Sequence, residues 1–249
     1  MKNKKFLGQH WLKNRGILDE VARLTGRGEV CVEIGPGLGT LTSSLLKKFS
    51  KVIAIEYDKD LANNLPKSFP GKNLEVINAD ILDYDFDGIE KPYMIAGNIP
   101  YYITSPIIEK LIKLDNRPRK IVLLVQKEVA ERIVDKKETF LSLLVKNRAE
   151  ATLGPVVKKE EFIPPPKVDS QVIVLIPHAP KVGLEVFTLI RRGFSAPRKK
   201  LVHNLAGLAS KEELIKMFLE LGISPDVRPG DIHLFDWQKI FKELSRSSK

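Results

Sequence analysis

The regular alternation of short apolar runs with helix-like segments is the feature that most constrains how this chain folds. Five runs rich in aliphatic and β-branched residues punctuate the first 130 residues, and each run is hydrophobic almost throughout. Such continuity is typical of parallel strands that are buried on both faces. The five runs cover residues 30–34, 52–56, 74–78, 93–97 and 121–126.

Segments with apolar residues at three-to-four spacing lie between these runs, and a further helical region at 127–148 follows the fifth. Strands that alternate with helices predict an open, doubly wound α/β sheet. Residues 171–176 add one more strand.

Two prolines and a glycine interrupt the chain at residues 177–183, which favours a linker there. Beyond this segment the pattern is helical. We therefore expect a first domain over residues 1–178, with a basic N-terminal segment, and a small all-helical domain over residues 183–249.

The charge is concentrated at the two ends of the chain. Of the net charge of +10, residues 1–15 supply five basic and no acidic side chains, residues 181–249 supply 13 basic and eight acidic ones, and the middle is balanced. A polyanionic partner, most simply nucleic acid, explains this distribution. Ordinary solvated lysines are the alternative.

Composition narrows the class of protein further. A chain of 249 residues with 43% hydrophobic side chains supports a sizeable core, which excludes disorder. The single cysteine, Cys31, and four scattered histidines form no zinc-ligand pattern, so we expect a reducing compartment and no metal. No segment has the apolar run of a signal peptide or a membrane span, and we expect a cytoplasmic protein.

A glycine-rich turn follows the first predicted strand in the segment Glu33-Ile-Gly-Pro-Gly-Leu-Gly39. Such a turn lets the backbone approach a ligand, although a tight turn of purely structural role is the alternative. Glu56 ends the next strand, where an acid meets the ribose hydroxyls of a bound nucleoside. Because Glu33 disfavours a pyrophosphate, we predict a nucleoside cofactor without phosphates.

Polar residues also end the third and fourth strands. Asp80 can accept a hydrogen bond from an adenine amino group, with a turn or helix-capping role as the alternative. The segment Gly97-Asn-Ile-Pro-Tyr101 is stiffened by Pro100, so that the Asn98 oxygen and a nearby carbonyl can accept from one exocyclic amino group while Tyr101 stacks on the base. Accepting these protons stabilises a transition state in which that nitrogen rehybridises.

These segments, with four others in the same order, closely resemble the small-subunit ribosomal RNA adenine dimethyltransferases. The resemblance extends from Phe6 to about Trp237. Its segments are Leu7-Gly-Gln-His-Trp-Leu12, Glu33 to Gly39, Glu56-x-Asp58, Asn78-Ala-Asp80, Gly97 to Tyr101, Gln126-Lys-Glu-Val-Ala-x-Arg132, Phe162-Ile-Pro-Pro-Pro-Lys-Val-Asp-Ser170 and Arg198-Lys-x-Leu-x-x-Asn-Leu205.

The resemblance implies a Rossmann-like domain that uses S-adenosyl-L-methionine to transfer two methyl groups to N6 of each of two adjacent adenosines. The target implied is a hairpin loop near the 3′ end of small-subunit ribosomal RNA, within a pre-ribosomal small subunit, and we expect a monomer. The expected cofactor residues are His10, Leu12, Glu33, Gly35, Gly37, Gly39, Glu56, Asp80, Ile81 and Asn98. The expected catalytic residues around the target adenine are Asn98, Pro100, Tyr101 and Phe162.

Two aromatic side chains have a structural alternative. Phe162 precedes three prolines and could clamp the other face of the base, or it could anchor a buried loop. Trp11, together with His10, could cover the cofactor, although packing of the first helix onto the sheet is the interpretation we prefer for Trp11.

Basic residues cluster around a helix start in the second domain, with Ser195 as a possible cap. Together with helix N–H groups they form a potential phosphate site, and a solvated helix face is the alternative. The expected RNA-binding residues are Lys4, Lys5, Arg191, Arg192, Arg198, Lys199 and Lys200.

The chain departs from the family pattern at two places. Pro197 stands where an arginine is frequent, and residues 135–141 are short and lack a Tyr-Gly before Leu-Ser. These departures concern RNA contacts and leave the chemistry unaffected. Two rival functions stay open: a resistance methylase acting on large-subunit RNA, which would usually lack the 162–170 block followed by this helical tail, and a non-catalytic RNA-binding assembly or transcription factor that kept the fold.

Overall fold

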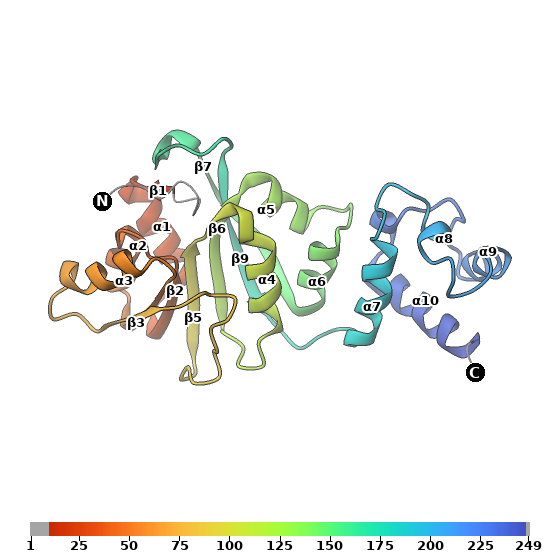
Figure 1. Ribbon diagram of the computed structural model, residues 1–249, viewed down its shortest axis with the longest axis horizontal. Coiled ribbons are helices and arrows are strands. Elements are labelled where there is room, and N and C mark those ends of the chain that lie inside the picture. The colour runs from red at the N-terminus through yellow and green to blue at the C-terminus, as the bar shows by residue number, and fades with distance from the viewer. Residues whose placement is uncertain (1–9, 248–249) are drawn as a thin grey trace. The chain divides into compact units, whose positions relative to one another are not determined.

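The computed structural model describes residues 10–247, which form two compact units (Figure 1). The first unit comprises the residues up to Glu131 together with Ala149–Pro177. The second comprises Arg132–Arg148 and the residues from His178 onward. Within the described residues no helix is both long enough and apolar enough to cross a membrane.

A seven-stranded sheet with the order β4-β3-β2-β5-β6-β9-β7 forms the centre of the first unit. The first five strands in this order are parallel, and β9 runs antiparallel to both of its neighbours. The chain proceeds from β2 outward to β4 and then returns to β5 on the other side of β2, so the strand order reverses there. The strands are β2 (Gly28–Ile34), β3 (Phe49–Glu56), β4 (Leu74–Asn78), β5 (Tyr93–Asn98), β6 (Lys120–Gln126), β7 (Ala149–Val157) and β9 (Ser170–Pro177).

Apolar side chains cover both faces of the sheet. On one face α1 (Arg15–Thr25) and α2 (Thr40–Leu45) share a core cluster with strand residues such as Ala96 and Val122. The intervening strand residues, such as Ile95, are equally buried. The prediction of buried parallel strands is therefore confirmed for β2, β3, β5 and β6, whereas no residue of the edge strand β4 is fully buried. The other helices of this part of the chain are α3 (Lys59–Asn64), α4 (Thr104–Lys113) and α5 (Lys127–Val134), the last of which extends past the unit boundary.

A separate two-stranded ribbon joins the N-terminal segment to the Phe162–Ser170 block. In it β1 (Trp11–Leu12) pairs antiparallel with β8 (Phe162–Ile163), with Leu12 opposite Phe162. Both of these side chains are 1% exposed. The ribbon holds the start of the described chain against the first unit.

The second unit is helical, and its core contains two aromatic contacts. The rings of Phe140 and Phe187 meet edge to face with their centroids 6.2 Å apart. The fully buried Trp237 packs so closely on Gly193 that a Cβ atom there would overlap the indole. The helices are α6 (Phe140–Arg148), α7 (Leu184–Gly193), α8 (Leu201–Asn204), α9 (Lys211–Glu220) and α10 (Leu234–Ser247).

The second unit starts earlier in the chain than the sequence indicates. We expected residues 132–148 within the first domain, whereas the structure groups them with the C-terminal helices, because α6 packs on α7 and α10. The chain crosses between the units again after Pro177, inside the expected linker.

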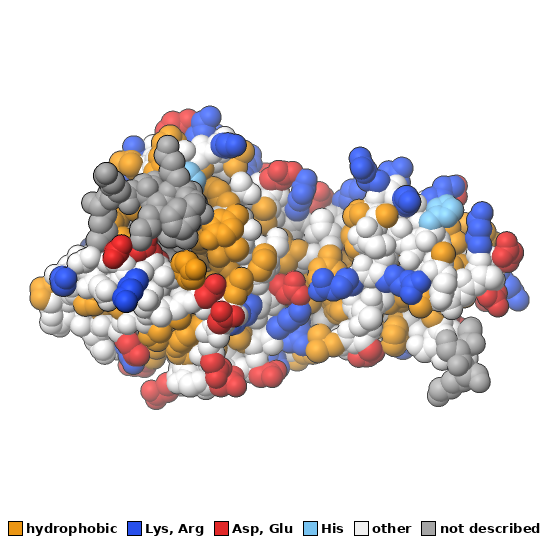
Figure 2. Space-filling model, viewed as in Figure 1, with side chains coloured by type: hydrophobic (Ala, Val, Ile, Leu, Met, Phe, Trp, Pro, Cys, Tyr) orange, Lys and Arg blue, Asp and Glu red, His pale blue; other side chains and the backbone are white. Residues whose placement is uncertain are grey.

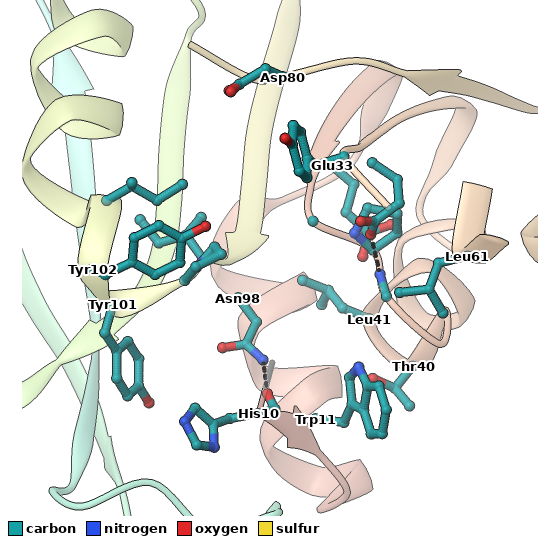
Figure 3. Close-up of a pocket in the computed structure, with 18 of the residues that line it drawn as sticks. His10, Trp11, Glu33, Thr40, Leu41, Leu61, Asp80, Asn98, Tyr101 and Tyr102 are labelled. Atoms are coloured by element: carbon teal, nitrogen blue, oxygen red, sulfur yellow. Dashed lines mark hydrogen bonds between the residues drawn. The ribbon is translucent and has the colours of Figure 1, made fainter. Parts of the chain in front are cut away.

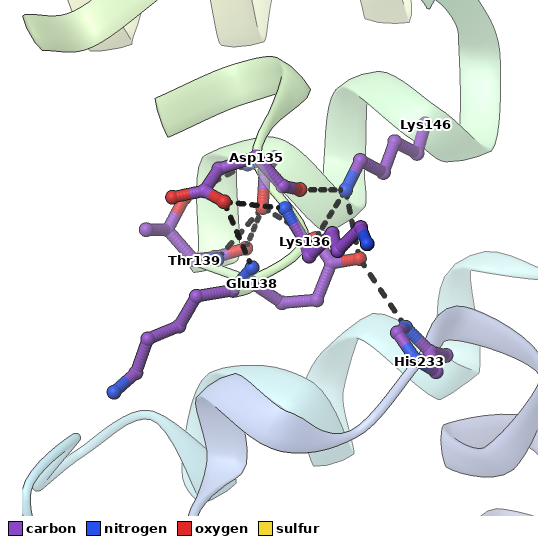
Figure 4. Close-up of polar contacts among 8 residues, drawn as sticks. Asp135, Lys136, Glu138, Thr139, Lys146 and His233 are labelled. Carbon is purple, nitrogen blue, oxygen red and sulfur yellow. Dashed lines mark hydrogen bonds and ion pairs between the residues drawn. The ribbon is translucent and has the colours of Figure 1, made fainter. Parts of the chain in front are cut away.

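A buried carboxylate anchors the loop that precedes α6 (Figure 4). Glu138, with its side chain 4% exposed, accepts hydrogen bonds from Lys146 Nζ at 2.8 and 2.9 Å and from Ser142 Oγ at 2.7 Å. Its backbone N–H donates to the Gly230 carbonyl at 2.7 Å, and its Oε1 lies 3.7 Å from His233 Nδ1. The short loop at residues 135–141 is therefore tied into the second unit.

Candidate active site

A pocket of about 390 Å³ opens at the carboxyl ends of β2, β3 and β5, where the strand order reverses (Figure 3). Ligands of open α/β sheets bind at this kind of position. Turns after four successive strands of the chain, β2 to β5, contribute to its lining. Nine residues expected from the sequence to bind cofactor or adenine lie in it: His10, Glu33, Gly35, Gly37, Glu56, Asp80, Asn98, Pro100 and Tyr101.

The turn after β2 has a left-handed backbone at each of its glycines. The φ angles are 65° at Gly35, 57° at Gly37 and 81° at Gly39. Glycine adopts this conformation at no steric cost, whereas a side chain at Gly37 would also lie 3.1 Å from the Trp11 indole nitrogen. The wall of the pocket is therefore formed here by main chain.

Glu56 ties this turn to the neighbouring strand. Its Oε2 accepts a hydrogen bond from the Gly37 N–H at 3.0 Å, and its Oε1 accepts one from the Asp58 N–H at 2.8 Å. Asp58 in turn caps α3 through the N–H groups of Asp60 and Leu61. Since a carboxylate offers about four acceptor positions, Glu56 keeps capacity for the two ribose hydroxyls expected from the sequence.

Glu33 introduces a second carboxyl group that is almost completely buried, with 1% exposure. Burial raises its pKa to about 8, and repulsion from Glu56 acts in the same direction. Its Oε2 atom has no hydrogen-bond partner among the described residues. The pocket therefore contains a polar atom that a cationic or hydrogen-bond-donating group of a ligand would satisfy.

Asp80 has the turn role considered from the sequence, and it also lies where the proposed acceptor would be needed. Its Oδ1 accepts a hydrogen bond from the Leu82 N–H at 2.8 Å, and its carbonyl accepts one from the Tyr84 N–H at 3.0 Å, so it organises the turn after β4. Asp80 also lines the pocket. In Figure 3 its carboxylate lies apart from Asn98 and His10. An adenine amino group at this position would find an acceptor.

The orientation of the Asn98 amide is fixed by the N-terminal segment. Its Nδ2 donates a hydrogen bond to the His10 carbonyl at 2.9 Å (Figure 3). Because the amide nitrogen is engaged in this way, Oδ1 is the side-chain atom that could accept a hydrogen bond from a ligand. The acceptor role expected for the strand-end motif stays a prediction.

Tyr101 joins three segments that are distant in the sequence. Its ring stacks on the His10 ring, with centroids 5.8 Å apart and planes 22° apart. Its hydroxyl forms a hydrogen bond with the Oγ atom of the fully buried Ser170, and His10 Nδ1 lies 2.7 Å from the Pro164 carbonyl oxygen. Burial raises the pKa of Tyr101. The sequence offered no specific signal for Ser170 as its partner.

Four of the expected residues do not line the pocket. Phe162 was expected to clamp the base, but its ring lies in the core cluster that includes Leu12 and residues of α1 and α2, so the alternative of a buried loop anchor describes this structure. Leu12 is buried for the same reason, as its partner in the β1–β8 ribbon. Ile81 is 7% exposed behind Asp80, and Gly39 packs towards Leu65 and Phe69.

Two exposed tyrosines at the pocket were not predicted from the sequence. Tyr57 directly follows Glu56 and is 63% exposed, and Tyr102 directly follows Tyr101 and is 62% exposed. The available signal was an aromatic residue next to a site residue at a strand end. Trp11 also lines the pocket, next to Gly37, whereas the interpretation we preferred from the sequence was packing of the first helix onto the sheet.

The basic cluster of the second unit divides into engaged and free cations. Arg191 lies 4.3 Å from the ring centre of Phe140, and Arg192 donates a hydrogen bond to the Ala206 carbonyl. Lys200 Nζ lies 2.6 Å from Asp226 Oδ1. Arg198 and Lys199 form no ion pair within residues 10–247 and are exposed. Lys4 and Lys5 lie outside the described residues.

Comparison with known proteins covers both units. A family model described as ribosomal RNA adenine dimethylase matches residues 1–246. Ribosomal RNA small subunit methyltransferase A of Picosynechococcus sp. is 38% identical, over 98% of this chain and 98% of that protein. The crystal structure of a dimethyladenosine transferase from Plasmodium falciparum has a TM-score of 0.80 and 30% identity, over 96% of this chain and 98% of that one. The 23S rRNA methyltransferase ErmE shares the fold, with a TM-score of 0.74 and 23% identity over 94% of this chain and 99% of that one.

Proposed function

The chain belongs to the ribosomal RNA adenine dimethylase family, and from this premise we propose that its target is a pair of adjacent adenosines in a hairpin loop near the 3′ end of small-subunit ribosomal RNA. It is an S-adenosylmethionine-dependent methyltransferase that dimethylates N6 of adenine. One observation carries the proposal: Glu56, Asp80, Asn98 and Tyr101 meet in a single pocket of a chain that matches this family from end to end.

The two rival functions are not favoured. The relative with 38% identity over the full length carries a small-subunit name, whereas the large-subunit enzyme ErmE is only 23% identical and shares the fold alone. A factor that had lost its chemistry would have no need of the polar groups at the strand ends, and Asn98 and Glu56 both line the pocket.

The groups that line the pocket fit the chemistry of S-adenosylmethionine. The main chain at Gly35 and Gly37 gives close access, Glu56 would accept from the ribose hydroxyls, and Asp80 from the adenine amino group. The unpartnered Oε2 of Glu33 would receive the cationic end of the methionine portion. When bound, the cofactor supplies a methyl group on a sulfonium centre, which is open to attack by a nitrogen lone pair.

The adenine half of the site positions and activates the nucleophile. Asn98 Oδ1 would accept a hydrogen bond from the N6 amino group, which holds that nitrogen in line with the methyl group and draws its lone pair out of the ring. Tyr101, held by Ser170, would stack on the base, and Pro100 keeps the backbone between the two residues extended. Positioning is the main catalytic contribution, because these residues form no covalent bond with the substrate.

The RNA would be held by phosphate contacts at some distance from the chemistry. In the second unit Arg198 and Lys199 are the cations of the basic cluster whose side chains have neither an ion pair nor a hydrogen bond in the described chain, and Figure 2 shows many Lys and Arg side chains over this unit. Such contacts fix orientation without reading sequence. Lys4 and Lys5 would add to them from the N-terminal segment.

We also propose a cellular location, an oligomeric state and a substrate particle for the enzyme. Since ribosomal RNA is the substrate of the family, we place the enzyme in the cytoplasm, acting as a monomer on a pre-ribosomal small subunit. Sedimentation of the purified protein alone and with small subunits would test both the monomer and the subunit as substrate.

The decisive experiment uses unmethylated small ribosomal subunits and cofactor labelled in its methyl group. Nuclease digestion and nucleoside analysis should give N6,N6-dimethyladenosine, and mapping should place it at two adjacent positions near the 3′ end of the RNA. Label in large-subunit RNA instead, or no transfer by folded protein that binds the cofactor, would overturn the proposal.

A further inference from the structure

The exposed aromatic ring of Tyr102 lines the pocket, near Asp80 and Tyr57, and has no role in the chemistry described above. It is 62% exposed, and its hydroxyl has no hydrogen-bond partner in the described part of the chain. An exposed aromatic ring beside a site offers a flat apolar surface on which another ring can stack. Figure 2 shows hydrophobic side chains exposed together on the first unit, with acidic side chains beside them.

Tyr102 is held on a rigid element. It belongs to a single turn of 3-10 helix, Tyr101–Ile103, that runs directly into α4. The Pro100 carbonyl accepts hydrogen bonds from the Ile103 N–H at 3.3 Å and from the Thr104 hydroxyl at 3.4 Å, which close the turn. A ring on such a support loses little conformational freedom when it stacks.

Tyr101 and Tyr102 are adjacent in the chain but have different environments. The Tyr101 hydroxyl forms a hydrogen bond with the buried Ser170, whereas the Tyr102 ring is largely exposed to solvent. Figure 3 shows the two rings apart from each other. A nucleic acid strand whose adenine enters between Asn98 and Tyr101 therefore passes a second aromatic surface beside the first.

The pocket rim favours contact with a base over contact with a phosphate. No Lys or Arg is among the described residues that line the pocket, whereas the Asp80 carboxylate, which lies near Tyr102, is among them. Phosphates would be repelled here, while the neutral face of a base would not. Proteins that recognise single-stranded RNA stack unpaired bases on aromatic side chains in this way.

From these observations we propose that Tyr102 is an RNA-binding residue that stacks on the nucleobase next to the adenosine being methylated. This inference rests on the proposed function, because it assumes a single-stranded RNA loop as substrate. It assigns recognition of two adjacent bases to consecutive residues of one motif: Tyr101 for the base that reacts and Tyr102 for its neighbour.

The test is a cycle of protein and RNA changes. The RNA is a synthetic hairpin with two adjacent loop adenosines, in its intact form and with the base removed on either side of the target. For the wild-type protein, loss of the neighbouring base on one side should weaken binding about 5- to 150-fold, the range for one base–aromatic stack. Tyr102→Ala should bind the intact hairpin weakly, and removal of the neighbouring base should not weaken its binding further.

Two variants separate stacking from other effects. Tyr102→Phe keeps the ring and should behave as the wild type. Phe235→Ala removes a ring of similar exposure, 57%, from α10 of the second unit and should retain the full penalty for the missing base. Cofactor affinity, measured by calorimetry, should be unchanged in Tyr102→Ala.

The outcomes distinguish this inference from the proposed function. Equal penalties for the missing base in the wild type and Tyr102→Ala, or weaker cofactor binding as the only effect of the change, would overturn the stacking role while methylation of small subunits continues. Wild-type protein that neither binds the hairpin nor methylates small subunits would contradict the proposed function instead.

Discussion

At the scale of single residues, Glu33 departs furthest from the behaviour of an exposed carboxyl group. Burial raises its pKa to about 8, against an ordinary value of 4.5. Between these two values the folded protein binds a proton that the unfolded chain releases, so the free energy of unfolding falls as the pH rises through this window. Below pH 4.5 both states hold the proton and the effect vanishes.

We therefore expect Glu33→Gln, which cannot ionise, to gain about 1–4 kcal/mol in the free energy of unfolding relative to the wild type between pH 5 and pH 8. Urea denaturation of the cofactor-free protein at several pH values measures this gain. Glu29→Gln, which changes an exposed glutamate of the same strand, serves as the control. A difference between Glu33→Gln and the wild type that stays constant with pH would show that Glu33 ionises normally.

Asn98 gives the second prediction at this scale. Because Oδ1 contacts the amino group most strongly in the transition state, Asn98→Ala should reduce the rate of methyl transfer about 100-fold and change RNA affinity little. Single-turnover assays with saturating cofactor and RNA measure the rate. Removal of the hydrogen bond to the His10 carbonyl is a separate effect, so circular dichroism and cofactor calorimetry accompany the assay. A rate close to that of the wild type would remove Asn98 from the chemistry.

At the scale of elements, the carboxyl end of β5 depends on close contact with the neighbouring strand β2. Gly97 pairs with Ile34 of β2, and a Cβ atom at Gly97 would lie 2.8 Å from the Ile34 carbonyl oxygen, which is part of the backbone and cannot move aside. Gly97→Ala should lower the free energy of unfolding by about 1–3 kcal/mol and disturb the adjacent Asn98. Gly88→Ala, where a Cβ meets nothing within 4 Å, should be tolerated. Thermal denaturation of both variants tests the contrast, and equal melting temperatures would contradict it.

The strands could be predicted from the sequence because burial on both faces leaves a continuous apolar run. The β1–β8 ribbon could not, since two-residue strands that lie about 150 positions apart carry no periodic signal. The same ribbon explains why the ring of Phe162 does not line the pocket. The three prolines after it indicated a stiff, extended segment and left both roles open, whereas pairing with Leu12 buries the ring.

At the scale of the whole molecule, charge provides a prediction that does not depend on the pocket. If Arg198 and Lys199 bind phosphates, changing both to Gln should weaken RNA binding and reduce the dependence of log affinity on log salt by about 0.7–0.9 for each phosphate that is no longer neutralised. Lys200→Gln should change the slope less, because Lys200 is paired with Asp226. Filter-binding titrations across a salt series measure the slope, and cofactor affinity should stay constant. An unchanged slope would mean that the two free cations face only solvent.

The sequence predicted much of the candidate site but not where the second unit begins. Residues at successive strand ends, together with the family resemblance for His10, predicted nine members of the pocket, because parallel strands bring their carboxyl ends to one edge. The sequence did not show that residues 132–148 belong to the second unit, because helical periodicity identifies an apolar face but not the partner that covers it. Only the contacts of Phe140 and Glu138 decide that question.

The chain passes between the two units three times, and α6 belongs to the unit that is otherwise completed by the C-terminal residues. The order of synthesis therefore matters. As the protein is made, α6 is available well before α7 and α10, and the apolar face that carries Phe140 stays uncovered until Phe187 and the residues beyond it have left the ribosome. Removal of everything after Pro177 would recreate that immature state permanently: a complete catalytic sheet that carries one helix without its partners.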